Sequence, residues 1–127
     1  MDTNDVIQLA FDADDRYLES NTVADVMHYA AIRKGWQSKR EAPAPTKGRK
    51  GRVDLLISHE GYTVAVEVDD RAIKGKSVEK LLSLDVDARV CVIARGDMDD
   101  IPNGIDAVVS IRERGCMMQG AYTMTWD

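Results

Sequence analysis

The sequence predicts a mixed α/β fold, in which helices flank one sheet, and three observations lead to this prediction. Apolar residues recur at helical spacing from Thr22 to Lys34, whereas "RVDLLISH" and "YTVAVEVD" carry the pattern of strands. A later run, "ARVCVIARG", is too apolar for an exposed edge and is typical of a central strand with a parallel neighbour. Helical and strand segments in this order favour α/β layers over a sandwich or a bundle.

The first third of the chain is predicted to be helical. Residues 5–19 form one candidate helix, although "DADD" weakens its apolar pattern. A second helix is expected to begin at Thr22, a favourable N-cap residue, with Asp25 placed for a capping box. Gly35 ends this helix.

The next segment is expected to contain one strand and one loop. Residues 36–42, "WQSKREA", alternate enough to form a strand. Residues 43–51, "PAPTKGRKG", are rich in Pro, Gly and Lys and are expected to form a flexible loop.

A hairpin of two strands follows, with Glu60 and Gly61 as its tight turn. If these two residues form the turn, every pair of facing residues has numbers that add up to 121. One face is then almost wholly apolar, because it pairs His59 with Tyr62, Ile57 with Val64, Leu55 with Val66, and Val53 with Val68.

The opposite face of this hairpin brings acidic residues together. Asp54 lies directly opposite Glu67, and Asp69 follows two residues further on the same side. Like charges on facing strands destabilise a sheet by roughly 0.2 to 1 kcal/mol per pair. A divalent cation removes this cost, whereas a solvated strand end is the alternative explanation.

Three further elements complete the predicted fold. A short helix over residues 77–85 is expected to be capped by Ser77, and it leads into the central strand at 88–96. Residues 104–113 are expected to form another strand, and residues 120–126 a terminal one.

Length and composition bound the function. A chain of 127 residues that is 44% hydrophobic is long enough for one domain, so residues 1–127 are predicted to be a single domain. No apolar run could span a bilayer, and the acidic start does not resemble a signal peptide, so a cytoplasmic protein without a membrane partner is expected. The two cysteines suggest reduced thiols, and no zinc-ligand spacing is present.

The distribution of charge favours a nucleic-acid partner, although the net charge of −5 does not. From Arg33 to Arg52 there are eight basic residues and one acid, which gives a local charge of +7 and leaves −12 for the rest. A basic stripe on an acidic body steers a phosphate backbone to one face. A solvated loop is the alternative.

The predicted order of elements, α-β-β-β-α-β, together with "GW", "GRVDLLI", "VAVEVDD" and "RVCVIARG", resembles the PD-(D/E)XK nuclease superfamily over about residues 22–95. This family includes restriction enzymes and Holliday-junction resolvases. The resemblance implies a restriction endonuclease-like core with short additions at both ends, and a metal-dependent enzyme that hydrolyses DNA phosphodiester bonds.

The resemblance also implies roles for single residues. Asp54 and Glu67 match the two metal-binding acids of the family, and the Val68 carbonyl is expected to help them hold Mg²⁺ or Mn²⁺. Asp69 stands where the family has its catalytic lysine. Either Asp69 acts as a base or ligand, or Lys74 or Lys76 supplies the missing ammonium group. Glu41 and Asp25 are the candidate accessory acids.

Basic residues near the predicted metal site are expected to bind the nucleic-acid backbone. They are Lys39, Arg40, Lys47, Arg49, Lys50, Arg52 and Arg71. The partner is then DNA, and cutting both strands of a duplex would favour a symmetric homodimer. Two alternatives remain open, namely a catalytically silent relative that binds DNA or a protein, and a structural subunit of a larger assembly.

Overall fold

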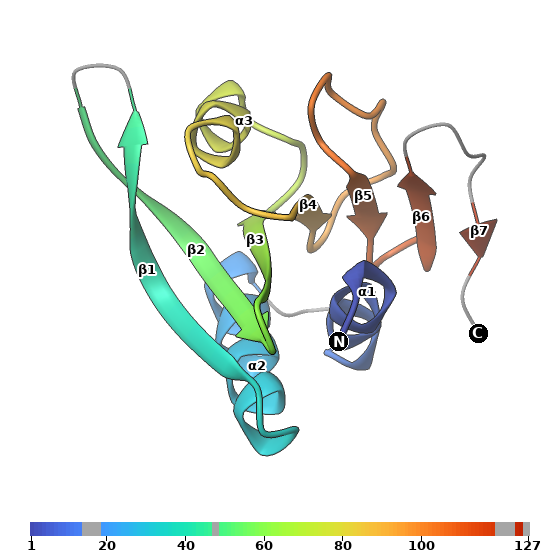
Figure 1. The fold of residues 1–127 in the computed structure, drawn as a ribbon. Helices are drawn as coiled ribbons and strands as arrows, with labels where there is room; N and C mark the ends of the chain where they lie inside the picture. The colour runs from blue at the N-terminus through green and yellow to red at the C-terminus, as the bar shows by residue number, and fades with distance from the viewer. Residues whose placement is uncertain (14–18, 47–48, 119–123, 126–127) are drawn as a thin grey trace.

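Three helices lie against one mixed sheet in the computed structural model, which describes residues 1–13, 19–46, 49–118 and 124–125 (Figure 1). The helices are α1 (Thr3–Asp12), α2 (Ser20–Arg33) and α3 (Gly75–Leu82). The strands are β1 (Gln37–Thr46), β2 (Arg49–His59), β3 (Tyr62–Asp69), β4 (Ala88–Ile93), β5 (Ala107–Ser110), β6 (Gly115–Met118) and β7 (Met124–Thr125). The predicted α/β class is therefore confirmed.

The strands lie in the sheet in the order in which they occur in the chain. Strands β1, β2 and β3 pair antiparallel, β3, β4 and β5 pair parallel, and β5, β6 and β7 pair antiparallel again. The prediction that the apolar run at 88–96 forms a central strand with a parallel neighbour is confirmed, because β4 pairs parallel on both sides. Parallel pairing requires a crossover, and α3 supplies it between β3 and β4.

Helices cover both faces of the sheet, and a separate apolar core lies on each side (Figure 1). On one face α1 and α2 pack against strand residues such as Leu55 and Val66. On the other face Leu81 of α3 packs against Ala65 and Cys91. A strand buried on both faces is apolar at nearly every position, which explains the composition of β4.

The two N-terminal helices begin earlier than predicted. Helix α1 begins at Thr3, because Asp2 and Asp5 form a capping box, and ends at Asp12; residues 14–18 of the predicted helix lie outside the described ranges. Helix α2 begins at Ser20, where the Glu19 carbonyl already accepts the Val23 N–H, so the predicted cap at Thr22 is wrong. Among the described helices, none is long and apolar enough to span a membrane.

The predicted loop over residues 43–51 is wrong, because most of this segment continues the strands. Strands β1 and β2 stay paired out to Thr46 and Arg49, and they form a long arm that extends beyond β3 (Figure 1). Strand β1 has no partner on its other side in the described sheet. An edge strand tolerates the missing N–H groups of Pro43 and Pro45, which explains why the prolines do not end it.

The β2–β3 hairpin has the predicted register from His59–Tyr62 to Leu55–Val66. Glu60 and Gly61, with φ angles of 50° and 83°, form its turn, and positive φ at both positions suits a two-residue hairpin loop. The predicted pair of Val53 with Val68 is wrong. Val53 packs in the core under α3, whereas Val68 packs in the core with α1 and α2, because the two strands separate beyond Leu55.

The C-terminal half follows the predicted order with changes at the ends. Helix α3 begins at Gly75 after an N-cap at Lys74, and Ser77, the predicted cap, lies inside it. Strand β5 lies within the predicted 104–113 segment, and β6 was not predicted. Strand β7 lies within the predicted 120–126 segment, most of which is outside the described residues.

The carboxyl ends of β3 and β4 approach each other so closely that Gly96 leaves no room for a side chain. A Cβ atom at Gly96 would lie 1.8 Å from the Arg71 carbonyl oxygen, which belongs to the backbone and cannot rotate away. We expect Gly96→Ala to lower the free energy of unfolding by about 2 kcal/mol, measured by urea denaturation. Gly75→Ala is the control, because a Cβ atom there meets nothing within 4 Å. Equal stability of the two variants would contradict this account of the strand ends.

Candidate active site

Asp54 lies where β2 separates from β3, and its side chain bridges the gap. The backbone pairing of the two strands ends at Leu55 and Val66. Beyond this pair, the N–H of Val68, two residues after Val66, donates to Oδ2 of Asp54 at 2.7 Å. The carboxylate thus takes a backbone N–H at the point where regular pairing has stopped. We call this region the β2–β3 fork, defined by Asp54, Glu67 and Val68.

The separation of the strands starts with a local distortion on the other side of β2. Strands β1 and β2 pair at Arg40–Leu55 and again at Ala42–Val53, but Glu41 and Asp54, which face each other between these pairs, are not paired. Glu41 has a φ of +53°, a left-handed conformation that non-glycine residues rarely adopt. Because the alternation of faces breaks here, Val53 and Leu55 pack against opposite cores.

Glu67 is the most deeply buried acid at the fork, at 2% exposure. Its Oε1 lies 3.1 Å from Nζ of Lys80, yet this oxygen accepts no hydrogen bond of good geometry from the described residues. Burial, together with a hydrogen bond to Asp54 and the charge of that carboxylate, raises the pKa of Glu67 to about 9. The predicted meeting of Asp54 and Glu67 is therefore present, as a hydrogen-bonded pair in which Glu67 keeps its proton at neutral pH.

Lys80 is the ammonium group that sequence reasoning missed. Partial burial by itself would lower the pKa of Lys80, but the charge of Glu67 and its hydrogen bond, with the charges of Asp54 and Asp69, together outweigh burial. The pKa therefore lies above its usual value, and Lys80 remains a cation. Lys74 and Lys76, the predicted candidates, are exposed near the start of α3. The ammonium group next to Glu67 is that of Lys80 instead, with Nζ 3.1 Å from Oε1.

The sequence contained a signal for Lys80, namely the crossover between two parallel strands. A helix in such a crossover runs back over the strand that precedes it, so residues further along α3 lie over residues further back in β3. Ser77 accordingly contacts Asp69, and Lys80, one turn later, contacts Glu67.

Asp69 is buried and holds the start of α3. Its Oδ1 accepts the Ser77 hydroxyl at 2.9 Å, and its Oδ2 accepts the Lys74 N–H at 3.0 Å. The residue is 7% exposed. Both carboxylate oxygens are therefore engaged in fixing the helix that carries Lys80, and this arrangement does not favour the predicted role as a base or metal ligand.

A thiol also lies beside Glu67. Cys91 of β4 is the strand partner of Glu67 and is buried. Burial, with the charges of Asp69 and Glu67, raises the pKa of Cys91 to about 12. The thiol therefore stays protonated at neutral pH and is neither a nucleophile nor a thiolate ligand.

The two predicted accessory acids lie outside the fork. Asp25 of α2 and Glu41 of β1 are exposed, and both face the guanidinium of Arg40. Nε of Arg40 donates to Oδ1 of Asp25 at 2.9 Å, and its Nη1 lies 3.6 Å from Oε1 of Glu41. Arg40 therefore neutralises these acids.

The donor set at the fork fits a hard divalent ion that binds few protein ligands. Within the described ranges there is no group of three or more His, Cys, Asp or Glu side chains that could hold a metal. Mg²⁺ is often held by only one or two carboxylates, with water and phosphate oxygens as its other ligands. Asp54 and Glu67 supply two carboxyl groups. Among the described residues, the buried Oε1 of Glu67 has Nζ of Lys80 at 3.1 Å but accepts no hydrogen bond of good geometry. Alternation along β3 directs the Val68 carbonyl to the same side as its N–H, toward Asp54.

The predicted nucleic-acid contacts divide into four groups. Lys39, Arg52 and Arg71 are exposed, whereas Arg40 is half-buried among protein acceptors. Arg49 and Lys50 lie on β2 in the arm, although their side chains are not described. Lys47 lies outside the described residues.

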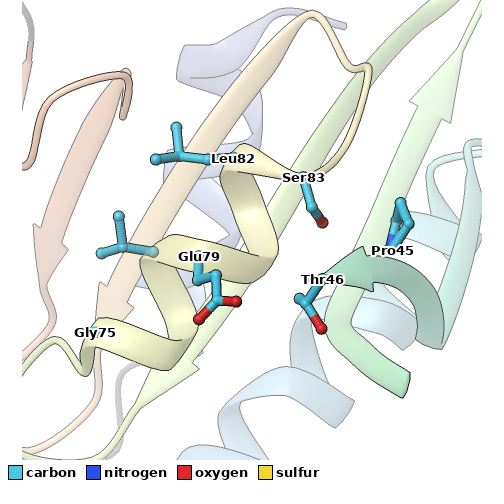
Figure 2. Close-up of a pocket in the computed structure, with 7 residues that line it drawn as sticks. Pro45, Thr46, Gly75, Glu79, Leu82 and Ser83 are labelled. Atoms are coloured by element: carbon cyan, nitrogen blue, oxygen red, sulfur yellow. The ribbon is translucent and has the colours of Figure 1, made fainter. Parts of the chain in front are cut away.

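A hollow of about 560 Å³ lies beside the arm, apart from the acidic pair. Its lining comes from the end of β1 and from α3 and includes neither Asp54 nor Glu67. In Figure 2, Glu79 and Ser83 lie on the side of α3 toward Thr46, whereas Leu82 points away from the arm. We place the candidate site at the fork because Asp54, Glu67 and Lys80 interact there.

The raised pKa of Glu67 predicts a pH dependence of stability. Between about pH 5 and pH 8 the unfolded chain releases the Glu67 proton, whose ordinary pKa is 4.5, while the folded chain keeps it up to about pH 9. The free energy of unfolding therefore falls as the pH rises in this range. The Glu67→Gln variant cannot ionise at this position. We therefore expect the difference in free energy of unfolding, variant minus native, to increase by at least ~1 kcal/mol from pH 5 to pH 8. Urea unfolding in EDTA measures the free energy of unfolding of the native chain and of the variant. If the two values changed with pH in parallel, the prediction would be contradicted.

No family model matches this chain, and no curated protein matches it. The crystal structure of a protein of unknown function, AF1548, is similar, with a TM-score of 0.48 and 12% sequence identity. The match covers 80% of this chain and 58% of the other, so this chain spans less than two thirds of the length of that protein.

Proposed function

We propose that this chain is a small metal-dependent nuclease of the PD-(D/E)XK kind, with a restriction endonuclease-like core, that hydrolyses DNA phosphodiester bonds. The observation that carries the proposal is the convergence of Asp54 and Glu67 at the fork, with Nζ of Lys80 3.1 Å from Oε1 of Glu67. An ordinary sheet avoids facing acids, and burial makes this pair costlier still. Binding of a divalent ion would offset the cost of placing these two acids side by side.

Each residue at the fork has a part in this proposal. Asp54 and Glu67, with the Val68 carbonyl, hold Mg²⁺ or Mn²⁺. A bound ion of this kind activates water and neutralises charge on the scissile phosphate. The Lys80 ammonium stabilises the negative charge that develops on the phosphate oxygens, the task for which the family's lysine is known. Asp69 keeps α3, and so Lys80, in place.

The DNA is held by basic residues on and beside the arm. Arg52 lies two residues before Asp54 on β2, so a backbone phosphate near Arg52 lies close to the fork. Lys39 and Arg71 are further exposed cations of the predicted set. A duplex cut on both strands requires two such sites, for which a symmetric homodimer is the simplest arrangement.

A second candidate function is a catalytically silent module of the same fold that binds DNA or a protein. The observation that favours it is the position of Asp69, whose two oxygens are occupied by Ser77 and Lys74 where the family has its lysine. Metal titration separates the two candidates, because the silent module binds DNA equally well with and without divalent ions.

We expect cleavage of supercoiled, linear, single-stranded or branched DNA in Mg²⁺ or Mn²⁺. Asp54→Asn and Glu67→Gln each lower the cleavage rate by more than ~10²-fold, because each removes a carboxyl group proposed to hold the ion. Lys80→Met lowers it by about 10²-fold, and Lys76→Met by much less. Arg112→Met is the control, because Arg112 is exposed and pairs with Asp97 on the surface. Cleavage that persists in both acid variants would assign the activity to a contaminant and sink the proposal.

DNA binding itself is tested through its salt dependence. Replacing Arg49, Lys50 and Arg52 by Gln removes three positive charges from the arm. We expect the DNA affinity to fall, and the slope of log affinity against log salt to become shallower by about 2 to 3. Fluorescence anisotropy in EDTA measures both. An unchanged slope would mean that the arm does not contact phosphates.

A further inference from the structure

The Arg40 guanidinium donates hydrogen bonds to two other residues of the protein. Its Nη1 donates to the main-chain oxygen of Asp54 at 2.7 Å, and its Nε donates to Oδ1 of Asp25 at 2.9 Å. The side chain is 19% exposed, whereas that of Lys39, the preceding residue, is exposed. Arg40 thus joins α2 to the backbone of β2 at the residue where the fork begins.

The backbone at this point needs support that the sheet does not supply. Glu41 and Asp54 are missing from the paired residues of β1 and β2, and Glu41 is held at a φ of +53°. On the β3 side, regular pairing has also ended. Two hydrogen bonds that involve side chains hold Asp54 instead, one from Arg40 to its carbonyl and one from the Val68 N–H to its carboxylate.

We infer that Arg40 is a positioning residue, which fixes the backbone of Asp54 so that the Asp54 carboxylate stays against Val68 and Glu67. The Asp25 carboxylate in turn orients the guanidinium of Arg40 by accepting its Nε–H. The metal-binding consequence of this inference rests on the proposed function. The inference also assigns Arg40 and Asp25 roles different from the DNA contact and accessory acid that the sequence predicted.

The Val68 amide reports on the position of Asp54 without any ligand. We expect Arg40→Met to speed hydrogen exchange of the Val68 amide by about 10-fold or more, after correction for the change in global stability. Arg40→Lys restores part of the protection, because it keeps one donor. Arg112→Met, which breaks another arginine–aspartate pair, leaves it unchanged. Equal Val68 protection in the native chain and Arg40→Met would overturn the inference.

Binding measurements distinguish positioning from phosphate contact. We expect Arg40→Met to weaken Mn²⁺ binding by about 10- to 100-fold by calorimetry, as loss of a group that orients a ligand does. DNA affinity in EDTA and its salt slope stay unchanged. A salt slope shallower by about 1, with Mn²⁺ affinity intact, would make Arg40 a phosphate contact and overturn the inference. If the native chain binds no Mn²⁺, the proposed function fails, and Val68 exchange still decides the role of Arg40.

Discussion

The enforced proximity of Asp54 and Glu67 is the constraint around which the rest of the fork is arranged. Two carboxyl groups side by side in a place with little water cannot both be ionised at small cost. The fold meets this cost by three means, which are a proton retained on Glu67, the ammonium of Lys80 at 3.1 Å, and the Val68 N–H on Asp54. The groups involved come from β2, β3 and α3. The Asp54–Glu67 pair therefore depends on the correct placement of all three elements.

Helix α3 contributes to the fork through two residues one turn apart. Ser77 hydrogen-bonds Asp69, and Lys80 reaches Glu67, because α3 runs back along β3. Asp69 therefore holds the start of α3, and the cation near Glu67 comes from the helix.

The separation of β2 from β3 follows from the two cores on either side of the sheet. Leu55 packs under α1 and α2, and Val53 packs under α3, so β2 must change the face it presents between these residues. Asp54 is the residue in between, and it loses regular pairing on both sides. Burial of the valine and the leucine in different cores thus places a polar side chain where unpaired backbone groups need partners.

The sequence by itself determined the features that follow from the alternation of side chains along a β-strand, which repeats every two residues. Residues facing each other across a two-residue turn are known once the turn is known, so Glu60 and Gly61 were enough to bring Asp54 and Glu67 to the same end of the hairpin. The almost wholly apolar sequence of β4 likewise predicted a central strand with a parallel neighbour, because burial on both faces favours such a composition.

Only the tertiary structure decided the remaining features. The prolines of β1 became strand residues because β1 is at an edge of the described sheet, which local composition does not reveal. The left-handed conformation of Glu41 and the change of face at Asp54 come from packing against two cores, and no local pattern encodes it. Lys80 and Arg40 acquired their partners from the way α3 and α2 pack on the sheet, because side chains distant in sequence meet only where helix and strand directions are fixed together.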